Sequence, residues 1–219
     1  MSDASWSFKL RLITELERPD HWHLQSEDQC AFFGEYAARQ GYSHSDTNQI
    51  VTNLKKKPHL KNTMQWPHKL KAINTMSLSI AHNLTPDAIS KFTFVPIPSS
   101  KTKQNADYDD RIVQIVRGIN PKLDMRELLV TTTDREALHE GNKKRDLGEV
   151  ERSINVDQSL TTPEPSHVVL IDDLLTTGCT FRVCSKIIRK IWPDMAIFGI
   201  FVARRVIPKD ALEFEAAEV

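Results

Sequence analysis

The pattern of hydrophobic and polar positions changes near residue 91. Before that point, most apolar residues recur at the three- to four-residue spacing of helices. After it, short apolar runs alternate with helical patterns, which is typical of a parallel sheet covered by helices on both faces. The pattern predicts an α/β protein with two parts: residues 1–90, a mainly helical region serving as a hood, docking or substrate part, and residues 91–219, an α/β domain.

Within the first part, residues 8–16 can form a strand. Ser26, with Gln29 three residues later, resembles a capping box and predicts a helix that buries Cys30, Phe33 and Ala37 on one face. Three further helices are predicted, beginning at or near these residues: Asp46, His68 and Thr85.

In the second part, the elements alternate. Strands are predicted at 92–97, 128–132, 167–171 and 195–203. Helices are predicted at 109–119 and after Gly178. A polar stretch from about 133 to 162 separates the second strand from the third.

The most informative segment is VVLIDDLLTTGCT, from Val168 to Thr180. Four apolar residues predict a buried strand, and Asp172 and Asp173 stand near its carboxyl end. A Thr-Thr-Gly loop follows, and then a helix begins. Ligands of open parallel sheets bind at the carboxyl ends of the strands, so this segment predicts a binding site.

The residue types in this segment suit a sugar phosphate. Backbone N–H groups at a helix N-terminus carry partial positive charge and can hold a phosphate. Gly178 lets the backbone approach a ligand closely. Paired carboxylates can accept hydrogen bonds from the two vicinal hydroxyls of a ribose. The plainer alternative is a strand that ends in solvated acids before an ordinary helix.

All thirteen positions of this segment resemble the signature of type I phosphoribosyltransferases, which bind 5-phosphoribosyl-1-diphosphate (PRPP). The resemblance covers about half of the chain, from about 91 to 205. It implies a type I phosphoribosyltransferase-like parallel sheet flanked by helices. It also assigns a catalytic role to Asp172 and Asp173, and 5-phosphate binding to a run of five residues: Thr176, Thr177, Gly178, Cys179 and Thr180.

In this family, the loop after the first strand holds the diphosphate. Here that loop offers Ser99, Ser100 and Lys101. The Val-Pro-Ile-Pro stretch before it also resembles the competence-associated phosphoribosyltransferase-like proteins, but the zinc-finger cysteines common in those proteins are missing. A proline-rich turn with solvated lysines is the alternative.

Family enzymes also close a loop over the site between the second and third strands. The corresponding segment is 139–152, in which Lys143, Lys144 and Arg145 could meet the diphosphate. A solvated surface loop is the alternative.

A basic tract lies in the first part. Six lysines between residues 55 and 71 have no acid among them, and Trp66 lies between them. A nucleic acid or protein partner could bind there, with the aromatic ring stacking on bases. A solvated helix face is the alternative, and the more common one.

Composition narrows the remaining choices. The 29 basic and 29 acidic residues cancel, which excludes a strongly charged whole-protein field. Three cysteines without a C-x-x-C pair predict reduced thiols and a cytoplasmic protein. No signal core or membrane-spanning run is recognised, so no membrane association is expected. His21 and His23 lack further spaced ligands and are expected to be structural.

The resemblance implies an enzyme that transfers the phosphoribosyl group from PRPP to an unidentified acceptor, releasing diphosphate. Mg²⁺ is the expected cofactor. It would be held chiefly by PRPP oxygens, with Asp172 and Asp173 as the possible protein ligands. A homo-oligomer is also expected. Two alternatives stay open: a non-catalytic sensor of PRPP or a nucleotide, and an effector subunit that works with a partner.

Overall fold

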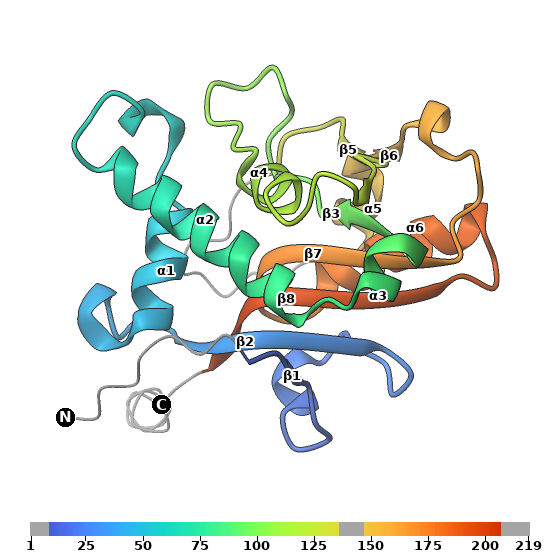
Figure 1. The fold of residues 1–219 in the computed structure, drawn as a ribbon, viewed down its shortest axis with the longest axis horizontal. Coiled ribbons are helices and arrows are strands. Elements are labelled where there is room, and N and C mark those ends of the chain that lie inside the picture. The colour runs from blue at the N-terminus through green and yellow to red at the C-terminus, as the bar shows by residue number, and fades with distance from the viewer. Residues whose placement is uncertain (1–8, 136–146, 207–219) are drawn as a thin grey trace.

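A six-stranded sheet forms the centre of the molecule (Figure 1). The computed structural model describes residues 9–135 and 147–206. Within these ranges the strand order across the central sheet is β1-β2-β8-β7-β3-β4. Their bounds are β1 Arg11–Leu12, β2 Gln29–Ala37, β3 Phe92–Pro96, β4 Asp124–Met125, β7 His167–Leu175 and β8 Ala196–Val206.

All neighbouring strands of this sheet run parallel, except that β1 pairs antiparallel with β2. Strand β7 lies between β3 and β8, with Phe94 opposite Val169 and Val169 opposite Phe198. Its apolar run is buried on both faces, as expected for a central parallel strand. The α/β class and the mostly parallel sheet flanked by helices are therefore confirmed.

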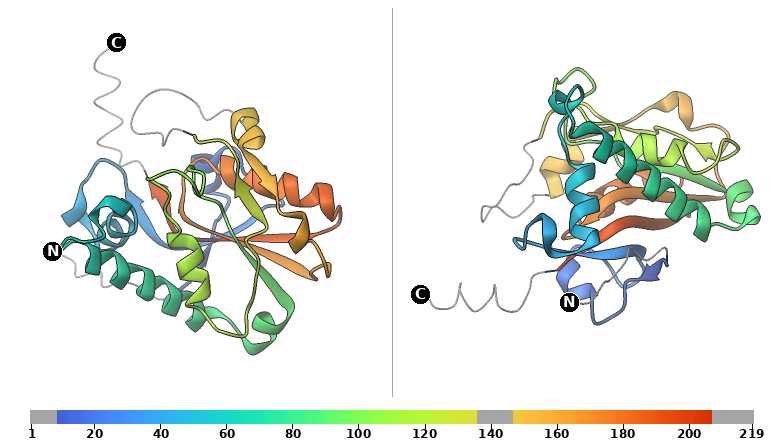
Figure 2. Two further views of the ribbon diagram at one scale, coloured as in Figure 1. Left: turned by 90° about the horizontal axis from the view of Figure 1, so that it is seen from above. Right: turned by 60° about the vertical axis from the view of Figure 1, so that its left-hand side comes forward.

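Helices cover both faces of the sheet (Figure 2). Buried residues of α1, α2 and α4 form one apolar core with the sheet, and those of α5 and α6 form another on the opposite face. The helices span α1 Asp46–Leu54, α2 Trp66–Asn83, α3 Pro86–Lys91, α4 Arg111–Arg117, α5 Leu147–Ser153 and α6 Cys179–Ile191. Short 3-10 turns occur at η1 Arg18–His21, η2 Tyr42–His44, η3 Pro58–Leu60 and η4 Gln158–Leu160.

The predicted helix after Ser26 is wrong, because this segment forms strand β2. Phe32 and Phe33 are both buried, and they belong to the cores on opposite faces of the sheet. Only a strand sends neighbouring side chains to opposite faces. The apparent capping box had no capping role: the Ser26 hydroxyl donates to Glu27. The predicted boundary near residue 91 falls at the end of α3, and strands from both sides of it share the sheet.

Two other predicted helix starts are confirmed. Thr85 caps α3 by accepting from the Ala88 amide, with Pro86 at the first helical position. Helix α1 begins at Asp46, but its cap is the preceding Ser45, whose hydroxyl accepts from the amide of Asn48.

Two predicted strands are present but differ from the expectation in length or in sheet membership. The strand expected over 8–16 is reduced to two residues in β1. The strand expected over 128–132 is β5, Leu129–Thr131, which pairs antiparallel with β6, Ile154–Val156, in a separate ribbon. The sheet instead takes β4, a two-residue strand too short to leave a hydrophobic pattern.

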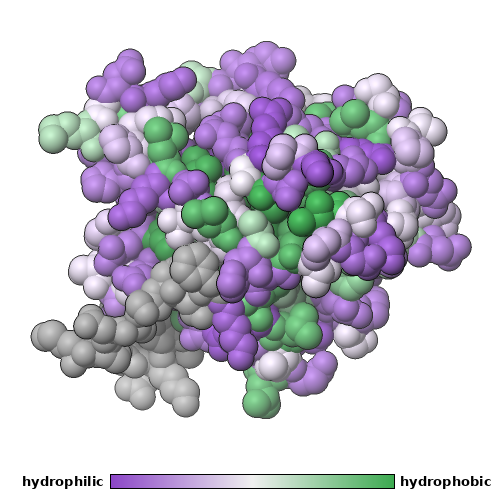
Figure 3. All heavy atoms as spheres, in the orientation of Figure 1, coloured by the Kyte–Doolittle hydropathy of each residue, from purple (hydrophilic) through white to green (hydrophobic). Residues whose placement is uncertain are grey.

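The surface is mainly hydrophilic on the face seen in Figure 3, with apolar side chains in small groups. Among the described residues, no helix combines the length and apolar character needed to cross a bilayer.

Replacing Phe32 with alanine tests the assignment of β2 to the core. Phe32 is fully buried, so Phe32→Ala should lower the free energy of unfolding by about 3–5 kcal/mol through lost burial and a cavity. Leu12→Ala on neighbouring β1 is the control: Leu12 is 67% exposed, so the change should stay within about 0.5 kcal/mol. Urea denaturation measures both. Equal effects of the two substitutions would contradict the buried position of β2.

Candidate functional site

The strand order of the central sheet reverses between β3 and β7. From β3 the chain passes outward to β4 on one side, and from β7 it passes to β8 on the other. The loops after β3 and β7 therefore leave from neighbouring strands at the same, carboxyl edge of the sheet (Figure 1). Such a switch point is where open α/β sheets bind ligands. The predicted phosphate and diphosphate loops are these two loops.

The loop after β7 forms a tight turn into α6. Gly178 has φ of 82° and occupies the position before the first helical residue. The Thr177 hydroxyl accepts from the amide of Cys179 at 3.3 Å. Thr176 and Thr177 are partly exposed, whereas the next three residues are buried: Gly178, Cys179 and Thr180. Any ligand here meets the two threonines and the backbone of the turn.

A segment from the N-terminal part packs against this turn. The His23 amide donates to the Thr177 carbonyl at 2.9 Å, and His21 Nδ1 donates to the Thr176 carbonyl. Leu24 lies so close that a Cβ on Gly178 would come within 2.8 Å of its side chain. Because both carbonyls are held on this side, the peptide planes of the turn are fixed.

His21 itself is fully buried. Burial lowers the pKa of its imidazole, so the ring is neutral at pH 7 and Nδ1 carries the proton that the Thr176 carbonyl accepts. The expected structural role of His21 agrees with this contact.

The two acids differ in their surroundings. Asp173 is 5% exposed, and its Oδ2 accepts from Nε and Nη2 of Arg111 at 2.9 and 2.6 Å. Asp172 is half-buried, and its Oδ1 accepts from the Asp173 amide at 2.8 Å. The pair is therefore unequal: Asp173 is bound inside the protein, and Asp172 is the more accessible carboxylate.

The ion pair continues behind the site. Arg111 Nη1 also donates to Asp109 at 2.8 Å, and Lys69 Nζ donates to the same Asp109 oxygen at 2.7 Å. Lys69 is fully buried and also donates to the carbonyls of Leu54 and Lys56, at 2.5 and 2.7 Å. We call the four side chains Lys69, Asp109, Arg111 and Asp173 the ion-pair chain. It links α1, α2 and α4 to the end of β7.

This arrangement separates the pKa values of the two acids. Burial raises the pKa of Asp173, but the adjacent Arg111 and the Lys55 charge outweigh it and hold that pKa well below its usual range. For Asp172, burial and the negative charge of Asp173 act together and raise its pKa to about 7. Near neutral pH, Asp173 is ionised and Asp172 can gain or lose a proton.

The predicted diphosphate residues Ser99, Ser100 and Lys101 are partly exposed in the loop after β3. Lys101 donates its amide to the Ser99 hydroxyl at 3.2 Å, and the Arg135 amide donates to the Ser100 carbonyl at 2.8 Å. The structure thus brings this loop to the same sheet edge as the acid pair.

The predicted basic residues of the closing loop, Lys143, Lys144 and Arg145, lie outside the described residues. The end of that predicted 139–152 loop is helical instead, because residues from 147 on belong to α5. Val150 anchors this helix in the core, which the polar composition of the stretch concealed.

Sequence reasoning missed Arg111, Asp109 and Lys69. One signal was available: Arg111 is the first residue of α4, where the helix dipole disfavours a cation. An arginine in that position indicates a specific acidic partner. Lys69 gave no such signal, because it lies in a run of lysines that are mostly exposed.

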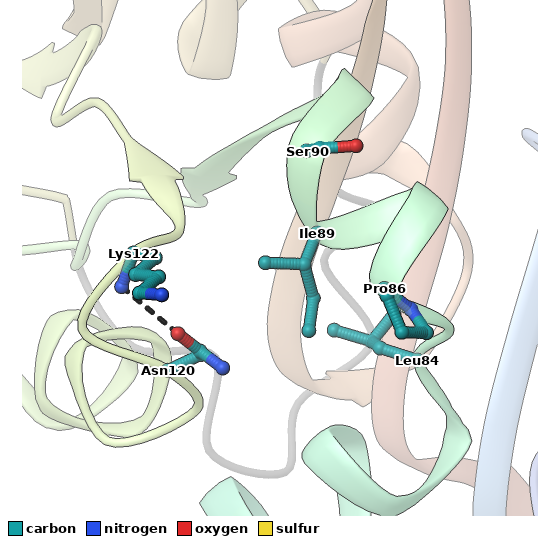
Figure 4. Close-up of a pocket in the computed structure, with 6 residues that line it drawn as sticks. All are labelled: Leu84, Pro86, Ile89, Ser90, Asn120 and Lys122. Atoms are coloured by element: carbon teal, nitrogen blue, oxygen red, sulfur yellow. Dashed lines mark hydrogen bonds between the residues drawn. The ribbon is translucent and has the colours of Figure 1, made fainter.

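A separate apolar groove of about 370 Å³ lies at the opposite, amino edge of the sheet (Figure 4). Its six lining residues come from the connection between α2 and α3, from α3 itself and from the segment before β4: Leu84, Pro86, Ile89, Ser90, Asn120 and Lys122. It contains no carboxylate, and it lies away from the switch point. The candidate site is therefore the carboxyl edge.

The chain matches no protein-family model, and a search of curated proteins finds no match. A functional proposal therefore depends on the geometry of this edge.

Replacing Gly178 with alanine should disturb the turn in two ways. Alanine is strained at positive φ, and its Cβ would collide with Leu24. Gly178→Ala in a Leu24→Ala background is the matched control, because it keeps the positive φ and removes the side chain that the added Cβ would meet. Gly178→Ala should cost about 1–2 kcal/mol in that background, and about 1–3 kcal/mol more when Leu24 is present. Thermal and urea denaturation check this, and equal losses would show that Leu24 does not pack on the turn.

The pH dependence of stability tests the unequal acid pair. Asp172 has a raised pKa in the folded state, so folding retains a proton that the unfolded chain releases above about pH 4. Its contribution therefore lowers stability as pH rises from about 4 to 7. Asp172→Asn should reduce this loss of stability. The variant should therefore become more stable relative to the wild type as pH increases. Urea midpoints measured across this interval check the sign, and an unchanged difference between variant and wild type would contradict it.

Proposed function

We propose that the protein binds PRPP or a related ribose 5-phosphate compound at the switch point and transfers its phosphoribosyl group to an acceptor. The observation that carries this proposal is the juxtaposition, at one sheet edge, of the Gly178 turn and the acid pair Asp172 and Asp173. On this basis the fold is proposed to be that of the type I phosphoribosyltransferases.

The Gly178 turn supports binding of the 5-phosphate. It begins a helix of 13 residues, whose N-terminus favours an anion. In the described hydrogen bonds, the amides of Thr177 and Gly178 have no protein acceptor, so they are available to phosphate oxygens. The contacts of His21 and His23 hold the carbonyls of the same turn, which fixes the direction of these amides.

Asp172 is the carboxylate best placed to accept from ribose hydroxyls, because Asp173 already accepts two hydrogen bonds from Arg111. Asp173 serves differently: as a fixed negative charge beside the sugar it favours the positive charge that develops when the anomeric bond breaks. The two acids of the signature thus take separate roles.

The loop after β3 would hold the diphosphate through Ser99, Ser100 and Lys101. No group of three or more metal-ligating side chains occurs among the described residues. A Mg²⁺ ion would be held chiefly by diphosphate oxygens and water, and Asp172 could contact it because Asp173 is already bound to Arg111. The ion would supply charge neutralisation of the leaving group.

The reaction needs positioning more than covalent catalysis. The bond between the anomeric carbon and the diphosphate oxygen breaks, and diphosphate leaves with the electron pair. A bond then forms from the acceptor nucleophile to the anomeric carbon. The protein contributes by fixing the phosphate at the turn and the ribose at Asp172 while the reacting atoms approach.

One observation favours the second candidate, a non-catalytic PRPP or nucleotide sensor. Arg111 neutralises Asp173, so the charge available to stabilise a cationic transition state is smaller than two free carboxylates would give. A binding protein needs only the turn and a ribose contact.

Ligand binding and turnover tests separate these candidates. PRPP with Mg²⁺ should raise the melting temperature, because a ligand that binds only the native state stabilises it. Asp172→Asn should reduce that shift, and in an enzyme it should also remove diphosphate release measured across purine and pyrimidine bases, nicotinate and water.

Asp194→Asn is the control, because Asp194 is exposed in the connection between α6 and β8. It should leave both readouts unchanged. A melting shift without diphosphate release from any acceptor would select the sensor. The absence of a shift at millimolar PRPP would reject both candidates.

A further inference from the structure

A second groove, of about 420 Å³, lies near the carboxyl end of β2. Its lining includes Tyr36, Val51 and Leu60, together with four cationic or ionisable side chains: Lys55, Lys56, Lys57 and His59. The segment between α1 and α2 forms one wall and lies beside the loop after β3 (Figure 1). We call this hollow the basic groove.

The walls of the basic groove are held in place. Lys57 forms an ion pair with Asp107 at 3.1 Å, and Lys56 donates to the Gln65 carbonyl at 3.3 Å. Lys69 was expected to belong to a basic surface, but it is buried and anchors the carbonyls of Leu54 and Lys56. The basic tract therefore has two roles: Lys69 supports the wall, and its neighbours provide the charge.

All the charged side chains that line the groove are basic. No aspartate or glutamate lines it, and residues 55–71 contain none. Lys55 is exposed, and its side chain makes no hydrogen bond or ion pair among the described residues. Lys55 lines the groove, and its positive charge acts to lower the pKa of both Asp172 and Asp173.

We propose that the basic groove binds single-stranded nucleic acid. The lysines of the lining supply positive charge for the phosphates of a strand, and the half-buried Tyr36 offers an aromatic ring for stacking on a base. The volume of about 420 Å³ suits one nucleotide at a time. A single strand is favoured over a duplex because its unpaired bases can stack on the tyrosine ring. This proposal rests on residues other than the PRPP loops and can hold or fail independently of them.

Binding of a fluorescently labelled oligothymidylate and oligouridylate, followed by anisotropy at several salt concentrations, tests the proposal. Lys55→Gln with Lys56→Gln should weaken binding about tenfold or more. It should also reduce the slope of log affinity against log salt by about 1.4, since each lost phosphate contact on a single strand removes about 0.7. Lys55→Glu alone should weaken binding in a protein whose fold is unchanged, because that side chain holds nothing else.

Lys91→Gln with Lys122→Gln is the matched control, since it removes two lysines at the amino edge. It should leave affinity and salt slope unchanged. Binding lost equally in the control, no binding by the wild type at about 50 mM salt, or equal competition by polyglutamate would overturn the proposal. Equal competition by a mononucleotide at the same phosphate concentration would also overturn it, because the site would then take a small ligand. Asp172→Asn, which alters the switch-point site, should leave oligonucleotide binding unchanged, so that failure of the groove and failure of the switch-point site are distinguished.

Discussion

The buried ion pair between Arg111 and Asp173 is the interaction on which the carboxyl edge depends. It joins the end of a central strand to the start of α4, and Asp109 and Lys69 extend it to α2 and the end of α1. Buried ion pairs often contribute little net stability compared with apolar side chains of the same volume, but loss of one partner leaves an uncompensated charge. A buried ion pair can instead fix the geometry of the groups that form it. Here the chain of charges fixes where one carboxylate points and holds three helices in register with the sheet edge.

Fixing Asp173 in this way determines the chemistry left to Asp172. Two equivalent carboxylates side by side would share their repulsion, whereas a cation bound to one of them places the cost of ionisation on the other. The pKa of Asp172 is consequently raised to about 7, so this carboxyl group can gain or lose a proton near neutral pH. The strength of the proposed ribose contact should therefore depend on pH. A Mg²⁺ ion held next to the Asp172 carboxyl group would favour its ionised form.

The sequence predicted the sheet well where a strand was buried on both faces and was followed by a distinctive turn. Strand β7 and the Gly178 turn were recognisable because apolar residues, acids, threonines and glycine occur in a fixed order. Strand β2 was mistaken for a helix because its residues Cys30, Phe33 and Ala37 are buried at a spacing that also fits one helical face. The ion-pair chain could not be predicted, because Lys69 and Asp109 are 40 residues apart and their pairing depends on the packing of α2 against the loop before α4.

The basic groove and the candidate site share a physical foundation. Lys69 uses its three donors on the Leu54 and Lys56 carbonyls and on Asp109, so the wall of the groove and the anchor of Arg111 meet at one ammonium group. A ligand that displaced the Lys56 backbone would leave a donor of a buried cation unpaired, which is costly in a poorly solvated interior. The groove is therefore expected to bind without moving its wall. Coupling between the two sites would then pass through the charge of Lys55, which acts on both carboxylates directly and requires no displacement of the chain.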